Sequence, residues 1–193
     1  MTDNIDKYNK GNATVKNGAD DQKSDKTDNL ENNIEDNERK MVDVIIPTYR
    51  PAKEFGELLH RLEKQEYRPN RILVMNTGKE YWNSEWENYP LLEVHHLDQK
   101  DFDHGGTRKR AAELSTADIM VFMTQDALPA DRKMIGNLVR AVSRNSGTGA
   151  AYARQLPNAD CRFLERYTRS FNYPEQSSVK SLSDVETYGI KTY

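Results

Sequence analysis

The sequence predicts an α/β domain, a mostly parallel sheet with helices on both faces. Residues 42–46 and 71–75 are short, nearly unbroken apolar runs rich in β-branched side chains, which is typical of strands buried on both faces. Between them, apolar residues recur at helical spacing among charged ones. This alternation continues to about residue 143, and such an order favours a parallel sheet built from strand-helix-strand units.

Each element follows from a local pattern. The first strand is closed by Pro47, and Pro51 marks the start of the helix that follows. One face of that helix is apolar, formed by Phe55, Leu58, Leu59 and Leu62. Further patterns predict strands at 71–75, 91–94, 119–123 and 149–153 and helices at 107–114 and 131–143. After Pro157 the periodicity fades, and an irregular polar and aromatic stretch is expected.

Residues 1–40 are predicted to be a disordered polar tail, and residues 41–193 the folded domain. The tail has one Leu, two Ile and neither Phe nor Trp, so it cannot bury enough apolar surface to offset the loss of chain entropy. This segment contributes much of the low mean hydropathy of −0.93. The sequence has no terminating feature near Tyr193, which predicts that the domain is incomplete.

Charge and composition exclude several classes of protein. Of the 28 Lys and Arg residues 7 lie in the tail, and of the 31 Asp and Glu residues 10, which leaves 21 of each sign in the folded part. A nucleic-acid partner is not expected, because binding a phosphate backbone needs a basic excess. The single cysteine, Cys161, fits a reducing compartment. Without a secretory signal or an apolar run of roughly 20 residues, a cytoplasmic protein with no transmembrane segment is expected.

Polar residues follow the predicted strands, and in parallel sheets ligands bind where the carboxyl ends of neighbouring strands converge. After the first strand come Pro47, Thr48, Tyr49 and Arg50, which offer a hydroxyl, an aromatic face and a cation. After the second comes Asn76, whose amide could pair with the edge of a base. Each segment is also an ordinary turn sequence, so the functional and the purely structural interpretation both stay open here.

The segment from His104 to Arg108 is a candidate phosphate site. Gly105 and Gly106 let the backbone approach a ligand, Thr107 could cap the helix at 107–114, and Arg108 lies near its positive end. Histidines and aspartates nearby lack the spacing of a structural zinc site.

Gln125 and Asp126 follow the strand at 119–123. A carboxylate at the tip of a buried strand is held rigidly, which suits a Mg²⁺ or Mn²⁺ ion that bridges two phosphates. The alternative is that Asp126 caps the next helix, but Asp131 lies closer to that helix.

Four segments, taken in order, resemble the inverting family 2 glycosyltransferases of the GT-A fold, and within them a rhamnosyltransferase-like branch. They are VDVIIPTYRP at 42–51, ILVMNTGK at 72–79, FDHGGTRKRAA at 102–112 and MTQDALP at 123–129. The resemblance implies a domain that binds a nucleotide-diphosphate sugar.

The resemblance also implies residue roles. Thr48 and Tyr49 would lie by the nucleoside, Asn76 by the base, and residues 104–108 near the diphosphate or sugar. Asp126 would be the last position of the family's D-x-D metal motif, with Gln125 beside it as a pocket-lining group. The chain departs from the pattern at Thr124, the first position of that motif, and at Asn76, where many relatives carry an acid.

The implied reaction is a single displacement with inversion, catalysed by a hexosyltransferase-type enzyme. A carboxylate base would deprotonate the acceptor hydroxyl while a metal at Asp126 stabilises the departing nucleoside diphosphate. That base is expected in an acceptor half beyond Tyr193, since Asp160, Glu165 and Asp184 are distinguished only by being acidic. The resemblance implies transfer of a sugar, rhamnose by the branch's likeness, to a saccharide or lipid-linked acceptor in cell-surface polysaccharide biosynthesis. A peripheral place at the inner face of the cell membrane is a further expectation.

Three other functions are open to a chain of this kind. A non-catalytic nucleotide-binding fragment of such an enzyme fits the missing acceptor half. A dehydrogenase would need G-x-G-x-x-G after the first strand, where PTYRP stands, and a nucleotidyltransferase would need a glycine-rich basic loop there. Both are disfavoured.

Overall fold

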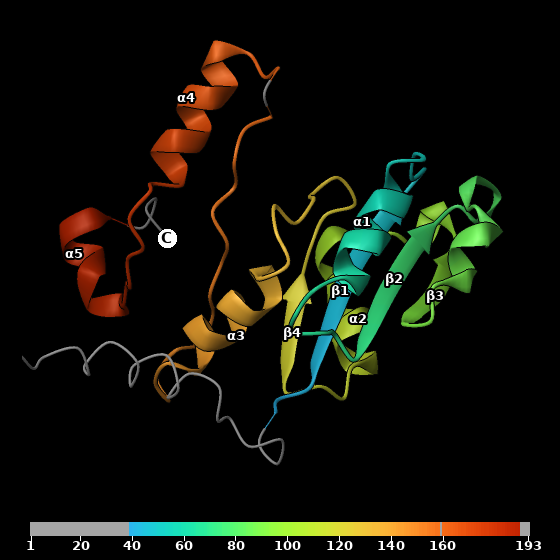
Figure 1. The fold of residues 1–193 in the computed structure, drawn as a ribbon, viewed down its shortest axis with the longest axis horizontal. Coiled ribbons are helices and arrows are strands. Elements are labelled where there is room, and N and C mark those ends of the chain that lie inside the picture. Colours follow the sequence, from blue (N-terminus) through green and yellow to red (C-terminus); the bar gives the residue numbers. More distant parts are fainter. Residues whose placement is uncertain (1–38, 159, 190–193) are drawn as a thin grey trace, which may run out of the picture. The chain divides into compact units, whose positions relative to one another are not determined.

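The computed structural model describes residues 39–158 and 160–189, so most of the predicted tail, residues 1–38, lies outside the described residues. Four strands form one sheet, namely β1 (Val42–Tyr49), β2 (Arg71–Thr77), β3 (Leu92–Leu97) and β4 (Ile119–Phe122). Their order is β3-β2-β1-β4, and every neighbouring pair is parallel (Figure 1). The predicted parallel α/β sheet is therefore confirmed.

Helices connect and follow the strands. The α-helices are α1 (Phe55–Glu63), α2 (His104–Leu114), α3 (Met134–Ser143), α4 (Phe163–Asn172) and α5 (Val185–Tyr188). The short 3₁₀ helices are η1 (Lys79–Tyr81), η2 (Ser84–Asn88), η3 (Gln99–Asp101) and η4 (Leu182–Asp184). No described helix is long and apolar enough to cross a membrane.

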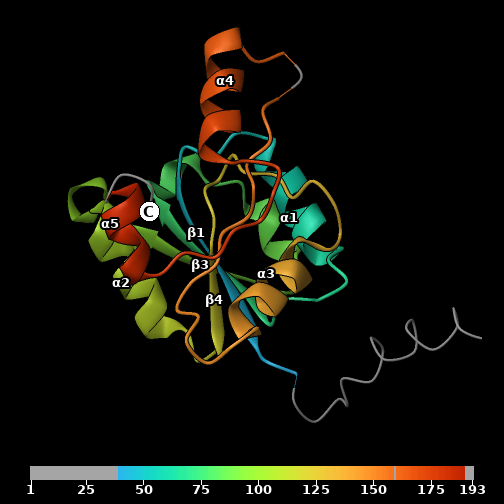
Figure 2. The same cartoon turned by 90° about the vertical axis from the view of Figure 1, so that its left-hand side faces the viewer.

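Two apolar cores lie on opposite faces of the sheet, because successive side chains of a strand point to opposite sides. Val42, Val44 and Ile46 of β1 belong to the larger core, together with residues of α1 and α3. Ile45 of β1 belongs to the smaller core, where Ala111 of α2 packs. The turned view places α2 on one side of the sheet and α1 and α3 on the other (Figure 2).

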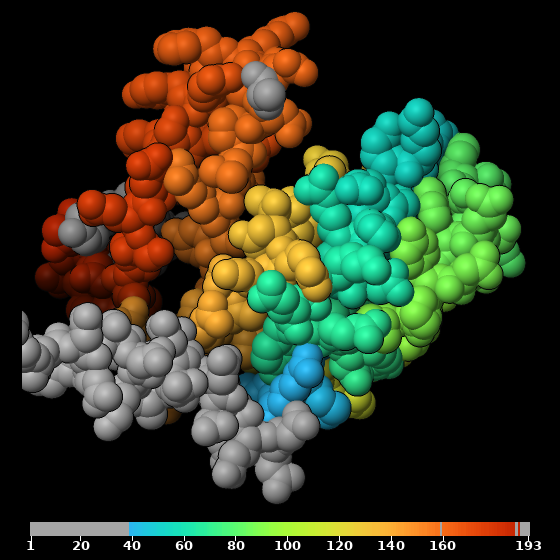
Figure 3. All heavy atoms as spheres, in the orientation of Figure 1, coloured from blue at the N-terminus to red at the C-terminus, as the bar shows by residue number. Residues whose placement is uncertain are grey.

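The larger core is the main source of burial. Leu58, Leu59 and Leu62 of α1 are fully buried, and burial of each such side chain contributes about 2 kcal/mol. As spheres, α1 in cyan to green and α3 in amber cover this face of the sheet (Figure 3). The apolar stripe predicted from the spacing of residues 55–62 is thus the surface that anchors α1.

Several element boundaries differ from the expected ones. β1 was expected to be closed by Pro47 but continues to Tyr49, because Pro47 to Tyr49 pair with β2, and β2 ends at Thr77 rather than at residue 75. β4 ends one residue earlier than expected, at Phe122.

α2 begins at His104 rather than at residue 107, because Asp103 serves as its N-cap residue. α3 begins at Met134 rather than at residue 131, where the Asp131 carboxylate accepts a hydrogen bond from the Lys133 amide in a turn. β3 starts one residue later and extends to Leu97, since it pairs with β2 along the whole length of that strand.

Two predictions for the C-terminal part were wrong. The strand expected at 149–153 is an exposed irregular segment, with no strand partner among the residues described. The stretch after Pro157, expected to be irregular, contains α4 and α5. The apolar residues of α4 are all exposed.

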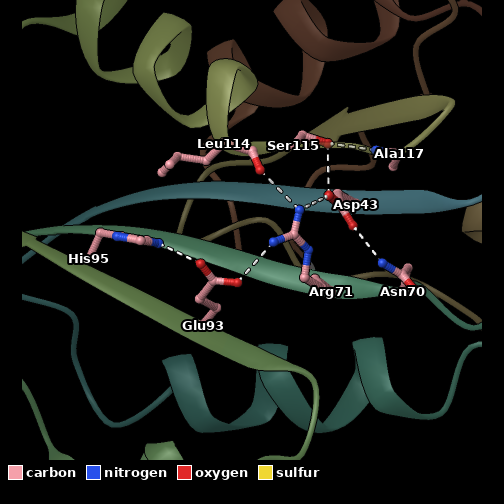
Figure 4. Close-up of polar contacts among 8 residues, drawn as sticks. All are labelled: Asp43, Asn70, Arg71, Glu93, His95, Leu114, Ser115 and Ala117. Atoms are coloured by element: carbon pink, nitrogen blue, oxygen red, sulfur yellow. Dashed lines mark hydrogen bonds and ion pairs between the residues drawn. The ribbon is translucent and has the colours of Figure 1, made fainter.

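A partly buried ionic network fixes the start of the strands (Figure 4). Asp43 of β1 is fully buried, and its carboxylate accepts hydrogen bonds from Arg71 of β2 (2.9 Å) and from the hydroxyl of Ser115, the residue after α2 (2.7 Å). Arg71 also donates to Glu93 of β3 (3.0 Å) and to the carbonyl of Leu114 (3.1 Å). Three strands and the end of α2 are therefore held in one register by charged groups.

Hydrogen bonds in this network shift the pKa values of Arg71 and Glu93. The bond to Asp43 raises the pKa of Arg71, and the contact with His95 at 2.8 Å lowers the pKa of Glu93, with Arg71 adding to the effect. Arg71 and Glu93 therefore favour their charged forms near neutral pH.

Candidate functional site

The strands end at one edge of the sheet because they are all parallel. We call the segments that meet there the rim, namely residues 47–50, 76–81 and 124–126. Hydrogen bonds made by side chains join the three segments directly. The rim is the edge opposite the network around Asp43, which lies at the start of β1.

Gln125 connects the segment after β4 to the end of β1. Its Oε1 accepts a hydrogen bond from the Tyr49 amide (2.8 Å), and its Nε2 donates to the Tyr49 carbonyl (3.2 Å). A side-chain amide suits this task because it carries one acceptor and one donor side by side. Gln125 was expected to line a pocket. In the structure, both its Oε1 and its Nε2 form hydrogen bonds with the main chain of Tyr49.

Tyr49, Arg50 and Tyr81 form a second contact between segments. The Arg50 guanidinium lies 4.4 Å from the centroid of the Tyr81 ring and 5.1 Å from that of Tyr49. Its Nη2 also donates to the Tyr81 hydroxyl (2.8 Å). Both rings remain accessible, at 39% for Tyr49 and 40% for Tyr81, so they can still contact a ligand.

Thr48, Asn76 and His96 form a line across β1, β2 and β3. The Thr48 hydroxyl donates to the Asn76 Oδ1 (2.9 Å), and the Asn76 Nδ2 donates to the Gly78 carbonyl (3.2 Å) and lies 3.0 Å from the His96 Nδ1. Burial, with Lys79 adding to the effect, lowers the pKa of His96, so the neutral ring can accept this bond. Asn76 is fully buried, and the structure shows its amide engaged inside the protein rather than open to a base.

A cleft of about 450 Å³ adjoins the rim. It is lined by residues 78–80 after β2 and residues 96–100 at the end of β3. Gly78 starts the first of these segments with φ +81°, where a Cβ would lie 2.9 Å from the Tyr81 ring, so glycine is required. None of the predicted site residues lines this cleft.

The start of α2 points toward the same edge of the sheet. Leu114 and Ser115, at the end of α2, contact Arg71 and Asp43 at the start of the strands. An 11-residue helix is about 16 Å long, so its first turn lies toward the rim side.

Asp103, rather than Thr107, caps this helix. Its carboxylate accepts a very short hydrogen bond from the Gly106 amide, and a Cβ on Gly106 would lie 3.0 Å from the same oxygen. Thr107 is buried, and Arg108 donates to the His104 carbonyl of its own helix (3.0 Å). In this structure a carboxylate therefore holds the position where a phosphate was expected, and contact of His104, Gly105 and Arg108 with a donor stays a prediction.

Asp126 is exposed in the turn that follows β4. Among the residues described, no group of three or more His, Cys, Asp and Glu side chains could hold a metal ion. One carboxylate nevertheless fits a Mg²⁺ or Mn²⁺ ion that is shared with substrate, because such ions are commonly held by one or two carboxylates together with phosphate oxygens and water. The residues thus fit a site that a diphosphate completes, and not a metal cage formed by protein alone.

The rim contains residues that sequence reasoning did not select. Arg50 was noted only as a cation after the first strand and was given no role, and Tyr81 lies in η1, which was not predicted. The signal for Gly78 was present, since Asn-Thr-Gly directly after a strand indicates a turn that needs positive φ. No sequence pattern indicated a role for Tyr81, because Tyr81 comes close to Arg50 only in the folded chain.

Comparison with known proteins gives a family for the sequence. The family described as "Glycosyl transferase family 2" matches residues 43–192. The O-antigen chain rhamnosyltransferase RfbN of Salmonella typhimurium is 38% identical over 158 residues, which cover 78% of this chain and 48% of the relative. The O-antigen chain rhamnosyltransferase WbaN of Salmonella anatum is 28% identical over 151 residues, covering 77% and 48%. The chain thus spans about half the length of these curated relatives.

Solved structures are similar over part of the chain. Residues 1–349 of TarS from S. aureus are 21% identical with a TM-score of 0.45, over 54% of this chain and 32% of that one. The mannosyltransferase PcManGT from Pyrobaculum calidifontis, solved with GDP-Man and Mn²⁺, is 25% identical with a TM-score of 0.45, over 53% and 32%. TM-scores this low support no functional inference.

Proposed function

We propose that this chain, which belongs to glycosyl transferase family 2, is the donor-binding part of a glycosyltransferase and binds a nucleoside-diphosphate sugar at the rim. The family match extends over all three rim segments. One observation carries the proposal most directly. The side-chain bonds from Thr48 to Asn76 and from Gln125 to Tyr49 bring the ends of β1 and β2 and the turn after β4 into one site.

Each rim residue has a role in the proposal. Tyr49 offers an accessible ring on which a base can stack, a contact worth about 1–3 kcal/mol in nucleotide-binding proteins. Pro47 and Thr48 shape the end of β1 beneath the nucleoside, and Asn76 holds Thr48 in place. Asp126 would hold the Mg²⁺ or Mn²⁺ ion, which supplies positive charge at the diphosphate.

The reaction follows from this arrangement. The acceptor hydroxyl oxygen forms a bond to the anomeric carbon from the face opposite the diphosphate, and the bond from that carbon to the phosphate oxygen breaks. The bonding electrons leave with the nucleoside diphosphate, and the hydroxyl proton passes to a carboxylate base, which we expect beyond Tyr193. The sugar is therefore transferred with inversion.

The names of the relatives guide the choice of substrates. Both are described as O-antigen chain rhamnosyltransferases. We therefore infer rhamnose as the sugar and a saccharide or lipid-linked acceptor in cell-surface polysaccharide biosynthesis.

A second candidate function rests on the length of the chain. The matched residues cover 48% of each relative, and the expected base lies outside them. On this interpretation the 193 residues bind the donor and do not transfer the sugar. A transfer assay with the complete coding sequence and with this chain separates the two functions.

A peripheral location at the cytoplasmic face of the cell membrane is also part of the proposal, and α4 supports it. Its apolar residues are highly exposed and share one face, namely Phe163, Leu164, Tyr167 and Phe171. Arg162, Arg166 and Arg169 give this segment an excess of positive charge over Glu165. An aromatic face with basic flanks suits the surface of an anionic bilayer. We expect the parent chain to sediment with anionic vesicles and the double variant Phe163→Ser, Phe171→Ser to lose this sedimentation. Equal sedimentation of the parent chain and the double variant would contradict the proposed location.

Calorimetry tests the proposed function. The full chain is titrated with UDP and dTDP, with and without Mn²⁺. Binding of one of them that strengthens with Mn²⁺ is expected, and Asp126→Asn should remove the gain from Mn²⁺ while leaving the metal-free affinity unchanged. A well-folded chain that binds neither nucleotide would refute the proposal.

A further inference from the structure

Arg50 has an unusual backbone conformation. With φ +48°, it is the one non-glycine residue with positive φ in the ranges 39–158 and 160–189. A residue with a side chain is strained there, and such strain persists only where the surroundings impose it. The surroundings are visible in this case, since Gln125 holds both the amide and the carbonyl of the preceding residue, Tyr49.

The side chain of Arg50 is held as well. Its guanidinium lies against the rings of Tyr49 and Tyr81, and Nη2 donates to the Tyr81 hydroxyl. These contacts use the face of the guanidinium and one of its several N–H groups. The other N–H groups remain available at an exposed position.

Stability does not explain an arginine at this position. Exposed cation–π contacts are weak, and the strain of positive φ opposes them. Glycine would relieve that strain. Within the described part of the chain, no carboxylate lies within ion-pair distance of Arg50, so none of the described residues compensates its positive charge.

The position of Arg50 indicates what could compensate that charge. It follows β1 directly and comes immediately after Tyr49, whose main-chain atoms bind Gln125, the neighbour of Asp126. Guanidinium groups bind phosphate oxygens well, because their N–H groups match the spacing of the oxygens and remain charged at all physiological pH values.

We propose that Arg50 is a ligand-contacting residue that binds a phosphate oxygen of the nucleoside diphosphate, and that Gln125, Tyr49 and Tyr81 hold it ready to do so. The inference rests on the function proposed above and adds a residue to that site. It explains the strained backbone, the stacked guanidinium and the unpaired charge by one role.

Arg50→Gly tests this role, because stability and binding should respond in opposite directions. The melting temperature of the full chain should stay the same or rise, since glycine tolerates positive φ. Affinity for UDP or dTDP should fall about 10-fold or more, as expected for loss of a charge-assisted hydrogen bond to phosphate. Arg50→Lys should recover part of the loss. Affinity for uridine and thymidine, measured by competition, should not change.

Lys53→Ala is the matched control, because it removes an exposed cation from the same loop and should leave nucleotide affinity nearly unchanged. Equal nucleotide affinity in Arg50→Gly and the parent chain would overturn the inference. A lower melting temperature, or an equal loss of nucleoside affinity, would also overturn it, since the role would then be structural or would concern the base. If the parent chain binds neither nucleotide, the proposed function itself fails, which is a distinguishable result.

Discussion

The amide of Gln125 is predicted to control nucleotide affinity without touching the ligand. It makes two hydrogen bonds to the main chain of Tyr49, at 2.8 and 3.2 Å. At about 1 kcal/mol for each bond, Gln125→Leu removes about 2 kcal/mol that favours the joined rim. If the joined rim is the form that binds, nucleotide affinity should fall by up to about 30-fold. Calorimetry with UDP and dTDP measures this loss, and thermal unfolding checks that the variant folds.

Gln125→Glu gives a sharper version of the same prediction. An ionised carboxylate can accept from the Tyr49 amide but cannot donate to the Tyr49 carbonyl, whereas a protonated carboxyl can do both. Affinity relative to the parent chain should therefore rise as pH falls from 8 toward 5. Gln155→Glu is the control, because Gln155 accepts a bond from Arg169 and a carboxylate can replace it there. The reasoning would be refuted if Gln125→Leu bound nucleotide with the affinity of the parent chain. It would also be refuted if the affinity of Gln125→Glu relative to the parent chain did not vary with pH.

Two further predictions concern stability. Asp43→Asn keeps the size of a fully buried side chain but removes the charge that Arg71 and Ser115 contact. The free energy of unfolding, measured with urea, should therefore fall by about 2 kcal/mol. A decrease no greater than that caused by Glu113→Gln, at an exposed position, would contradict this prediction. Because the pKa of His96 is lowered in the folded chain, the unfolded chain binds a proton at His96 at a higher pH than the folded chain does. The stability that the neutral ring contributes is therefore complete above about pH 6.5 and is lost as pH falls below that value. Melting temperatures of His96→Gln should depend less on pH across this range than those of the parent chain, and parallel profiles would count against the assignment.

Local patterns were enough to predict the elements that bury regular apolar faces. β1, β2, β4 and α1 were predicted because their apolar residues follow one period with few interruptions. β3 was predicted too short, since His95 and His96 are polar and only pairing with β2 keeps them in the strand. α4 had a readable signal, because Phe163, Leu164, Tyr167 and Phe171 recur at helical spacing, but its apolar face is exposed in the structure.

Contacts between distant residues could not be predicted from local patterns. Asp43 sits in an apolar run without any local sign of its partners, and Arg71 and Ser115 reach it only in the folded chain. The same holds at the rim. Gln125 was expected to line a pocket at the strand ends, but its bonds to the Tyr49 main chain depend on the pairing of β1 with β4 in the folded chain. Glycines 105 and 106 indicated a loop, and only the Asp103 cap shows that they begin α2.

The most direct test of the donor site is paramagnetic broadening in the NMR spectrum of the full chain. Mn²⁺ with UDP or dTDP should broaden the amide signals of Tyr49, Gln125 and Asp126, because the ion and diphosphate would lie at the rim. Signals of Asp43 and Ser115, at the opposite edge of the sheet, should remain sharp. Broadening centred at that opposite edge, or absent from the rim when nucleotide is bound, would contradict the account.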